Sequence, residues 1–116
     1  MNILVIEDDM NFMASMEASL QRRGYRVFTA KEGAYAVNIM NGNNVDLVLT
    51  DGEYTGNTVF AEWKKDNRPE IPMIVLSGGK EEYINRVFPV YNKFFKKGSS
   101  FNPEELFNCM KDILGE

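Results

Sequence analysis

The sequence predicts an α/β protein with a five-stranded, doubly wound parallel sheet. Five short apolar runs alternate with segments in which apolar residues recur at helical spacing. Uninterrupted apolar runs are typical of strands that are covered on both faces, and strands that alternate with helices form parallel sheets with right-handed crossovers and helices on both faces. The chain has 116 residues, about the size of one domain, so we expect one domain over residues 1–116.

The first three elements have clear boundaries. The run Asn2–Ile6 is predicted to be a strand that ends in acidic residues. Asp9 is suited to cap a helix over Met10–Arg23, and Gly24 provides its end. The β-prone stretch Tyr25–Ala30 predicts a second strand at an edge of the sheet.

The middle of the chain centres on a buried strand that ends in a carboxylate. A helix is expected over Gly33–Asn41, followed by a strand over Asp46–Thr50, with Asp51 at its carboxyl end. The residues Gly52–Thr58 are expected to form a loop, and a short helix is expected over Val59–Lys65. Ligands bind beyond the carboxyl ends of strands in open α/β sheets, although Asp51 alone fits the start of a turn equally well.

The last third repeats the pattern. Strands are predicted over Met73–Leu76 and Asn92–Lys96, with a helix over Glu81–Val87 between them. Asn102 and the proline after it are typical of a helix start, and this last helix has a buried apolar stripe. Trp63 and Cys109 are expected to pack on buried helix faces, whereas Lys64, Lys65 and Lys80 are expected to be solvated.

Composition narrows the class of protein. The chain is 44% hydrophobic and 26% charged, with no apolar run long enough to cross a membrane, so we expect a soluble protein. Thirteen basic and seventeen acidic side chains give a net charge of -4 without a basic cluster, which argues against direct nucleic-acid binding. The single cysteine and the absence of a signal peptide favour the cytoplasm. The absence of histidine argues against histidine catalysis and a zinc site, so any metal should be bound by oxygen atoms.

The predicted strand ends carry chemically matched side chains. Parallel strands bring to one rim the residues Glu7, Asp8 and Asp9, then Asp51, then Ser77, and finally Lys96 or Lys97. Two carboxylates about 4 Å apart repel by roughly 4 kcal/mol at an effective dielectric constant near 20, so a cation is expected among them. Carboxylate ligands suit Mg²⁺, and a lysine would neutralise the remaining charge. The structural alternative is a set of capping acids with a solvated lysine.

The motifs ILVIEDD, DLVLTD, the strand that ends in Ser77, and FFKKG make the whole chain resemble a receiver domain of response regulators in bacterial two-component signalling. This resemblance implies a flavodoxin-like sheet with the strand order 2-1-3-4-5. It also implies a phosphoacceptor domain in a phosphorelay rather than an enzyme, with no activity beyond self-phosphorylation and autodephosphorylation. Mg²⁺ is the implied cofactor. The implied partners are a histidine kinase or phosphotransfer protein and a downstream protein that binds the face of helix 4, strand 5 and helix 5.

The resemblance assigns a role to each site residue. Asp51 is the implied phosphoacceptor, Ser77 the hydroxyl residue, Lys97 the site lysine and Phe94 the aromatic switch. The implied metal ligands are Glu7, Asp8, Asp51 and the backbone carbonyl of Glu53.

The sequence departs from the family pattern at several positions, among them three that follow Asp51 or Lys97 in the chain. Thr55 stands where the family usually has proline, Val59 where it usually has glycine, and Gly98 where it usually has proline after the lysine. Lys96 therefore competes with Lys97 for the lysine position. These departures keep open a degenerate receiver that acts as an unphosphorylated docking module.

A phosphatase of the haloacid dehalogenase type is a weaker alternative. Asp51–Thr55 approximates its D-x-D-x-T motif, but that motif normally follows the first strand and has aspartate where this chain has Glu53. The segment Thr55–Thr58 resembles a flavodoxin phosphate loop still more weakly, again because that loop should follow the first strand.

Overall fold

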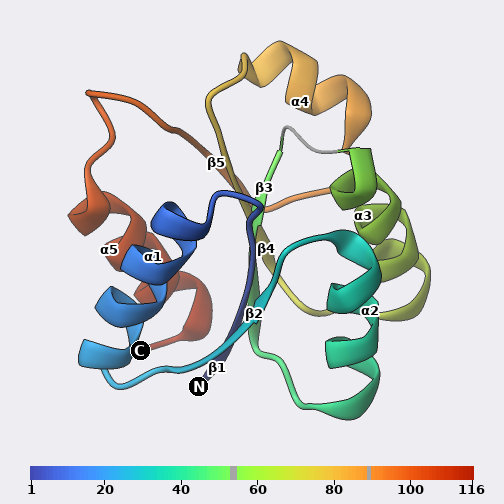
Figure 1. Cartoon of the computed structure of the whole chain (residues 1–116), viewed down its shortest axis with the longest axis horizontal. Coiled ribbons are helices and arrows are strands. Elements are labelled where there is room, and N and C mark those ends of the chain that lie inside the picture. The colour runs from blue at the N-terminus through green and yellow to red at the C-terminus, as the bar shows by residue number, and fades with distance from the viewer. Residues whose placement is uncertain (53–54, 89) are drawn as a thin grey trace.

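Five parallel strands form one sheet in the order β2-β1-β3-β4-β5, which confirms the predicted doubly wound topology. The computed structural model describes residues 1–52, 55–88 and 90–116, apart from the side chains of residues 55–57 and 87. Strands and helices alternate along the chain as β1 (Asn2–Ile6), α1 (Met10–Arg22), β2 (Arg26–Ala30), α2 (Gly33–Gly42), β3 (Leu47–Asp51), α3 (Thr55–Asn67), β4 (Met73–Ser77), α4 (Glu81–Val87), β5 (Lys93–Lys96) and α5 (Pro103–Leu114). Figure 1 shows α1 and α5 on one side of the sheet and α2 and α3 on the other.

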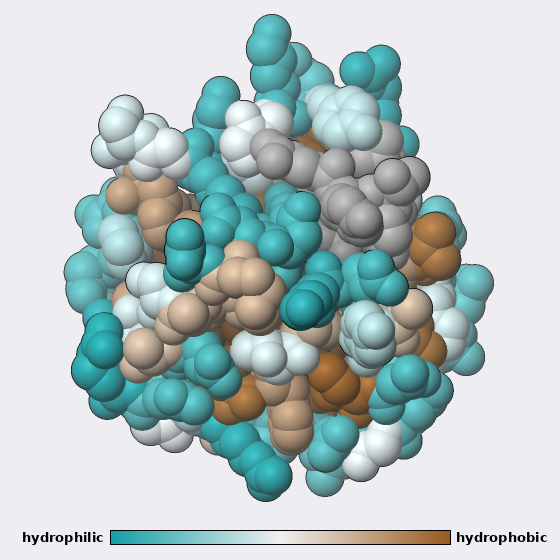
Figure 2. Space-filling model, viewed as in Figure 1, coloured by the Kyte–Doolittle hydropathy of each residue, from teal (hydrophilic) through white to brown (hydrophobic). Residues whose placement is uncertain are grey.

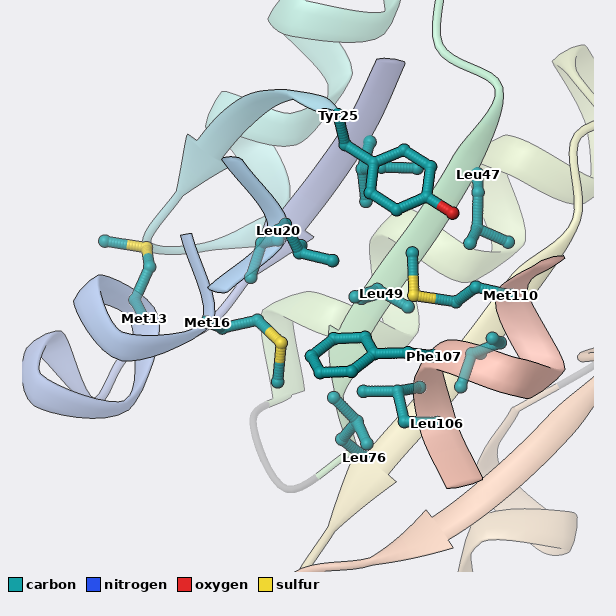
Figure 3. Packing of buried hydrophobic residues seen from close by; sticks show 13 residues of the cluster. Met13, Met16, Leu20, Tyr25, Leu47, Leu49, Leu76, Leu106, Phe107 and Met110 are labelled. Carbon is teal, nitrogen blue, oxygen red and sulfur yellow. The ribbon is translucent and has the colours of Figure 1, made fainter. Parts of the chain in front are cut away.

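Two hydrophobic layers hold the helices against the sheet. Alternate residues of β3 face opposite layers, because side chains alternate along a strand: Leu47 and Leu49 contact the cluster under α1 and α5, and Val48 contacts the other cluster. Figure 3 shows Phe107 and Met110 of α5 packed in the first layer. Every residue of β3 is buried, and β3 is the middle strand of the sheet. Its carboxyl end, at Asp51, is therefore held firmly by the surrounding core.

The helix α3 begins earlier than predicted. It begins at Thr55, whereas the sequence predicted a loop over Gly52–Thr58 and a helix only from Val59. Glycine and asparagine disfavour helices by less than about 1 kcal/mol each, a preference that tertiary contacts override. Here the buried Phe60 and Ala61 anchor the helix to the sheet, and the connection after β3 is correspondingly short.

Two side chains of α3 test the predictions about packing. Trp63 stacks with Phe60, their ring centroids 6.1 Å apart, which confirms it as a packing residue. The expectation of a solvated Lys64 was wrong, because its residue surface is only 6% exposed. It lies on the same helix face as Phe60 and Ala61, where the helical spacing places it against the sheet.

One groove on the surface of the described residues is partly lined by exposed hydrophobic side chains. The groove has a volume of about 480 Å³ and lies between α1, β2 and α2, and the exposed side chains of Met10 and Tyr35 contribute to its lining. Figure 2 shows brown and tan surface over this region, between hydrophilic side chains. None of the described helices is both long and apolar enough to cross a lipid bilayer.

Candidate functional site

The predicted acids and hydroxyl lie at one rim of the sheet. Glu7 directly follows β1, Asp51 is the last residue of β3, and Ser77 is the last residue of β4. Figure 1 shows β1 and β3 ending at this rim, in the upper part of the view. Because the strands are parallel and adjacent, residues that lie far apart in the sequence become neighbours here.

Three carboxylates form a compact cluster. Glu7, Asp8 and Asp51 each offer one oxygen atom, and these atoms lie within 4.8 Å of one another. Glu7 and Asp51 are buried, whereas Asp8 is exposed. An all-oxygen set of this kind suits a small hard cation such as Mg²⁺.

Asp9 has a different place from the other acids. Its side chain caps α1 by accepting hydrogen bonds from the backbone N–H groups of Asn11 at 3.0 Å and Phe12 at 3.1 Å. Its own N–H donates to Glu7 Oε2 at 3.2 Å. Asp9 therefore positions the start of α1 and orients Glu7, and it is not one of the three clustered carboxylates.

Lys97 is the lysine that the fold brings to the acids. Its ammonium group forms an ion pair with Glu7, and its Nζ lies 3.7 Å from Asp51 Oδ1. The backbone N–H of Lys97 also donates a hydrogen bond to the backbone carbonyl of Ser77 at 2.9 Å, which connects the segment after β5 to the end of β4. Lys96 is exposed on the edge strand and forms no ion pair within the described part of the chain.

Burial changes the protonation of the cluster. Desolvation raises the pKa of Glu7 to about 7, against the opposing influence of Lys97. The pKa of Asp8 is lowered: desolvation is the largest single influence and opposes the change, but hydrogen bonding with Glu7 and Asp51 and the charge of Lys97 together outweigh it. A cation bound among these carboxylates would favour the ionised form of Glu7.

Ser77 and Phe94 lie farther along the same end of the sheet. Ser77 is fully buried, and its Oγ accepts a hydrogen bond from the Gly79 N–H at 3.0 Å. A Cβ added to Gly52, the residue after Asp51, would lie 3.1 Å from Ser77 Cβ, so the serine borders the exit of β3. Phe94 is half-buried on β5 and packs against the cluster under α2, α3 and α4. The proposed ligand Glu53 lies outside the described residues.

A comparison with known families decides the identity of this fold. The family model of the response regulator receiver domain matches residues 3–108. The chain belongs to this family. Family membership places the chain in two-component signalling. It therefore favours a receiver domain over a phosphatase as the interpretation of the segment Asp51–Thr55.

Relatives and solved structures agree with this assignment. The receiver domain is 32% identical over 117 residues to the sensor kinase CckA of Brucella abortus (strain 2308), covering 97% of this chain and 12% of the relative. It is 34% identical over 79 residues to the transcriptional regulatory protein GlrR of Escherichia coli (strain K12), covering 66% of this chain and 18% of the relative. The chain thus spans less than a fifth of the length of these two curated relatives.

Two solved structures show the same fold. The response regulator protein TrrA of Thermotoga maritima, in complex with Mg²⁺ and BeF, superimposes with a TM-score of 0.83 at 24% identity, over 97% of both chains. The receiver domain of a sensor histidine kinase of Pseudomonas aeruginosa, with magnesium coordinated in its active-site cleft, superimposes with a TM-score of 0.80 at 24% identity, over 99% of this chain and 98% of the other.

One neighbour of the site was missed by sequence reasoning. The Nζ atom of Lys97 lies 4.4 Å from the centroid of the Phe12 ring. In the sequence Phe12 shares a helical spacing with Met16 and Leu20, which is typical of a core residue, and no sequence pattern links the first turn of α1 to the segment after β5. Only the assembled sheet brings the two side chains together.

Proposed function

We propose that this receiver domain accepts a phosphoryl group on Asp51 from the phosphohistidine of a histidine kinase or phosphotransfer protein, in the cytoplasm. The observation that carries the proposal is a buried carboxylate at the end of the central strand, with two further carboxylates and a lysine ammonium around it. The sensor-kinase relative and the structures with magnesium or BeF support the same reading.

The residues have complementary parts in this reaction. A carboxylate oxygen of Asp51 attacks phosphorus, the new O–P bond forms as the P–N bond breaks, and the imidazole of the donor leaves with the bonding electrons. Lys97 stays close to Asp51 and balances the charge on the phosphoryl oxygens. Ser77 donates its hydroxyl proton in a hydrogen bond to one of these oxygens.

The acidic cluster fits Mg²⁺, because its donors are all oxygen and its charge is otherwise balanced only by Lys97 among the described residues. Glu7, Asp8 and Asp51 would hold the ion, together with the backbone carbonyl of Glu53. When bound, Mg²⁺ neutralises charge that develops on the transferring phosphoryl group.

Phosphorylation of Asp51 changes the protein-binding surface of the domain by adding negative charge at one site. A hydrogen bond between Ser77 and the phosphoryl group draws the serine toward Asp51, which leaves space for Phe94 to turn inward. This movement changes the face of α4, β5 and α5, where a downstream protein binds. Phosphorylation thereby shifts the population between two arrangements of this face.

Intact-mass measurement after incubation with acetyl phosphate tests the proposal. The wild-type protein should gain one phosphoryl adduct in the presence of Mg²⁺ and none with a chelator. Asp51→Asn should abolish the adduct while the fold stays intact by circular dichroism, and Asp66→Asn, at an exposed aspartate of α3, should leave it unchanged.

An adduct on Asp51→Asn at the wild-type level would place the acceptor elsewhere. Absence of an adduct on the wild type, also with a phosphohistidine donor and with no response to beryllium fluoride, would favour the unphosphorylated docking module.

A further inference from the structure

The ammonium group of Lys97 has an aromatic neighbour as well as carboxylates. Its Nζ lies 4.4 Å from the centroid of the Phe12 ring, pairs with Glu7, and lies 3.7 Å from Asp51 Oδ1. The face of an aromatic ring attracts a cation within about 6 Å of its centroid. The Lys97 side chain is only 20% exposed, so this attraction acts in a partly desolvated environment, where it is stronger than at the surface.

The Phe12 ring is held in place from two directions. The N–H of Phe12 donates to the capping carboxylate of Asp9 at 3.1 Å, which sets where the side chain leaves α1. The ring is half-buried against the hydrophobic cluster under α1 and α5. Phe12 therefore presents a fixed face to the site.

Lys97 has less support of its own. It follows the last residue of the edge strand β5 and precedes Gly98, which has φ +136°, a conformation open to glycine and strained for other residues. A lysine side chain has many rotamers, and neither neighbour of Lys97 restrains the side chain: Lys96 points to solvent and Gly98 has no side chain. A ring over the ammonium limits the positions that the side chain occupies.

We propose that Phe12 is a positioning residue, whose ring holds the Lys97 ammonium group against Glu7 and Asp51. The consequence for phosphoryl transfer rests on the proposed function. The contact itself belongs to the unphosphorylated protein and can be measured without phosphoryl transfer.

A fluorinated series at position 12 isolates the electrostatic contribution. Phenylalanine is replaced in the full chain by its mono-, di- and trifluoro derivatives, which keep nearly the same shape and progressively remove negative charge from the ring face. The rate constant of adduct formation with acetyl phosphate and Mg²⁺ should fall stepwise, by about two- to tenfold in total. Phe12→Tyr should retain most of the rate, and Phe12→Leu should resemble the trifluoro derivative.

The matched control is the same series at Phe101, which is also half-buried against this cluster and lies over no cation among the described residues. Its rate constants should not change with fluorination. A purely structural role of Phe12 predicts no ordered trend along its own series, and a flat series with an active wild type would overturn the proposal.

A second readout keeps the inference separate from the proposed function. In the protein without phosphodonor, NMR relaxation should show that the motion of the Lys97 ε-methylene group is restricted in the wild type. The amplitude of this motion should increase along the fluorinated series at Phe12. Unchanged motion would overturn the proposal. If no Asp51-dependent adduct forms in any variant, the proposed function fails, and the relaxation series alone decides whether Phe12 positions the lysine.

Discussion

Lys64 carries a charge that its surroundings balance only in part. The residue is buried on α3, and within the described part of the chain it forms no ion pair or hydrogen bond through its side chain. The charge of Glu70 provides partial compensation, but burial dominates and lowers the pKa of Lys64. A methionine has a similar length and no charge.

We expect Lys64→Met to raise the free energy of unfolding by about 1–2 kcal/mol, because it removes the desolvation cost of the ammonium group. Urea unfolding followed by circular dichroism measures the change. The control is Lys65→Met at the exposed neighbour, which should change stability by less than about 0.5 kcal/mol. A destabilised Lys64→Met would mean that the ammonium group contributes favourably to the fold.

The same residue predicts a pH dependence. Its folded-state pKa lies below the usual 10.5, so between these two values the unfolded chain binds more protons than the folded protein. The contribution of Lys64 to stability then rises with pH across that window, since the cost of the buried charge disappears as Lys64 loses its proton. The difference in unfolding free energy between Lys64→Met and wild type should shrink as pH approaches 10.5. A constant difference would exclude Lys64 as the titrating group.

At the scale of elements, the position directly after β3 has little room for a side chain. A Cβ on Gly52 would lie 2.6 Å from Ile84 Cδ1 and 2.9 Å from Val75 Cγ1. Glycine at this position therefore lets α4 and β4 pack closely around the residue that follows Asp51. Overpacking at such positions costs about 1–3 kcal/mol.

Gly52→Ala should lower the free energy of unfolding by about that amount, measured by urea unfolding. Gly42→Ala is the matched control, because a Cβ there meets nothing within 4 Å. It should be neutral or slightly stabilising, since alanine reduces the conformational freedom of the unfolded chain. Equal effects of the two substitutions would show that the packing around Gly52 adapts without cost.

Most elements were predictable because their local pattern and their tertiary environment agree. Strands such as β3 contain continuous apolar runs, and α5 begins at Pro103, directly after Asn102, whose side chain caps it as the sequence predicts. The start of α3 was not predictable, because Gly56 and Asn57 locally favour a loop and the core packing of Phe60 decides otherwise. Lys64 was missed for a related reason: its charge predicted solvent exposure, but it follows Phe60 by four residues and therefore lies on the buried face of α3.

At the scale of the whole molecule, the parallel sheet explains why the acids could be predicted and Phe12 could not. Any group at a strand's carboxyl end reaches the rim in this topology, so Glu7, Asp51 and Ser77 follow from strand boundaries alone. The choice of Lys97 over Lys96 depends on the alternation of side chains at the end of an edge strand. Its contact with Phe12 depends on the packing of α1 against the sheet, for which the sequence holds no local signal.

The proposed Mg²⁺ site would couple metal binding to the stability of the whole fold. A ligand that binds only the folded state stabilises it by RT ln(1 + [L]/Kd), about 2.7 kcal/mol at a hundredfold excess over Kd. The cluster of Glu7, Asp8 and Asp51 exists only when β1 and β3 are paired, so Mg²⁺ should raise the free energy of unfolding.

Asp8→Asn should remove most of this stabilisation, because Asp8 is the exposed carboxylate of the cluster and the one whose pKa is lowered. Asp9→Asn is the matched control: asparagine also caps helices well, and Asp9 is not part of the cluster. Urea unfolding with MgCl₂ and with NaCl at equal ionic strength measures both effects. If Asp9→Asn lost the Mg²⁺ response and Asp8→Asn kept it, the metal site would lie at the start of α1 and not at the rim between β1 and β3.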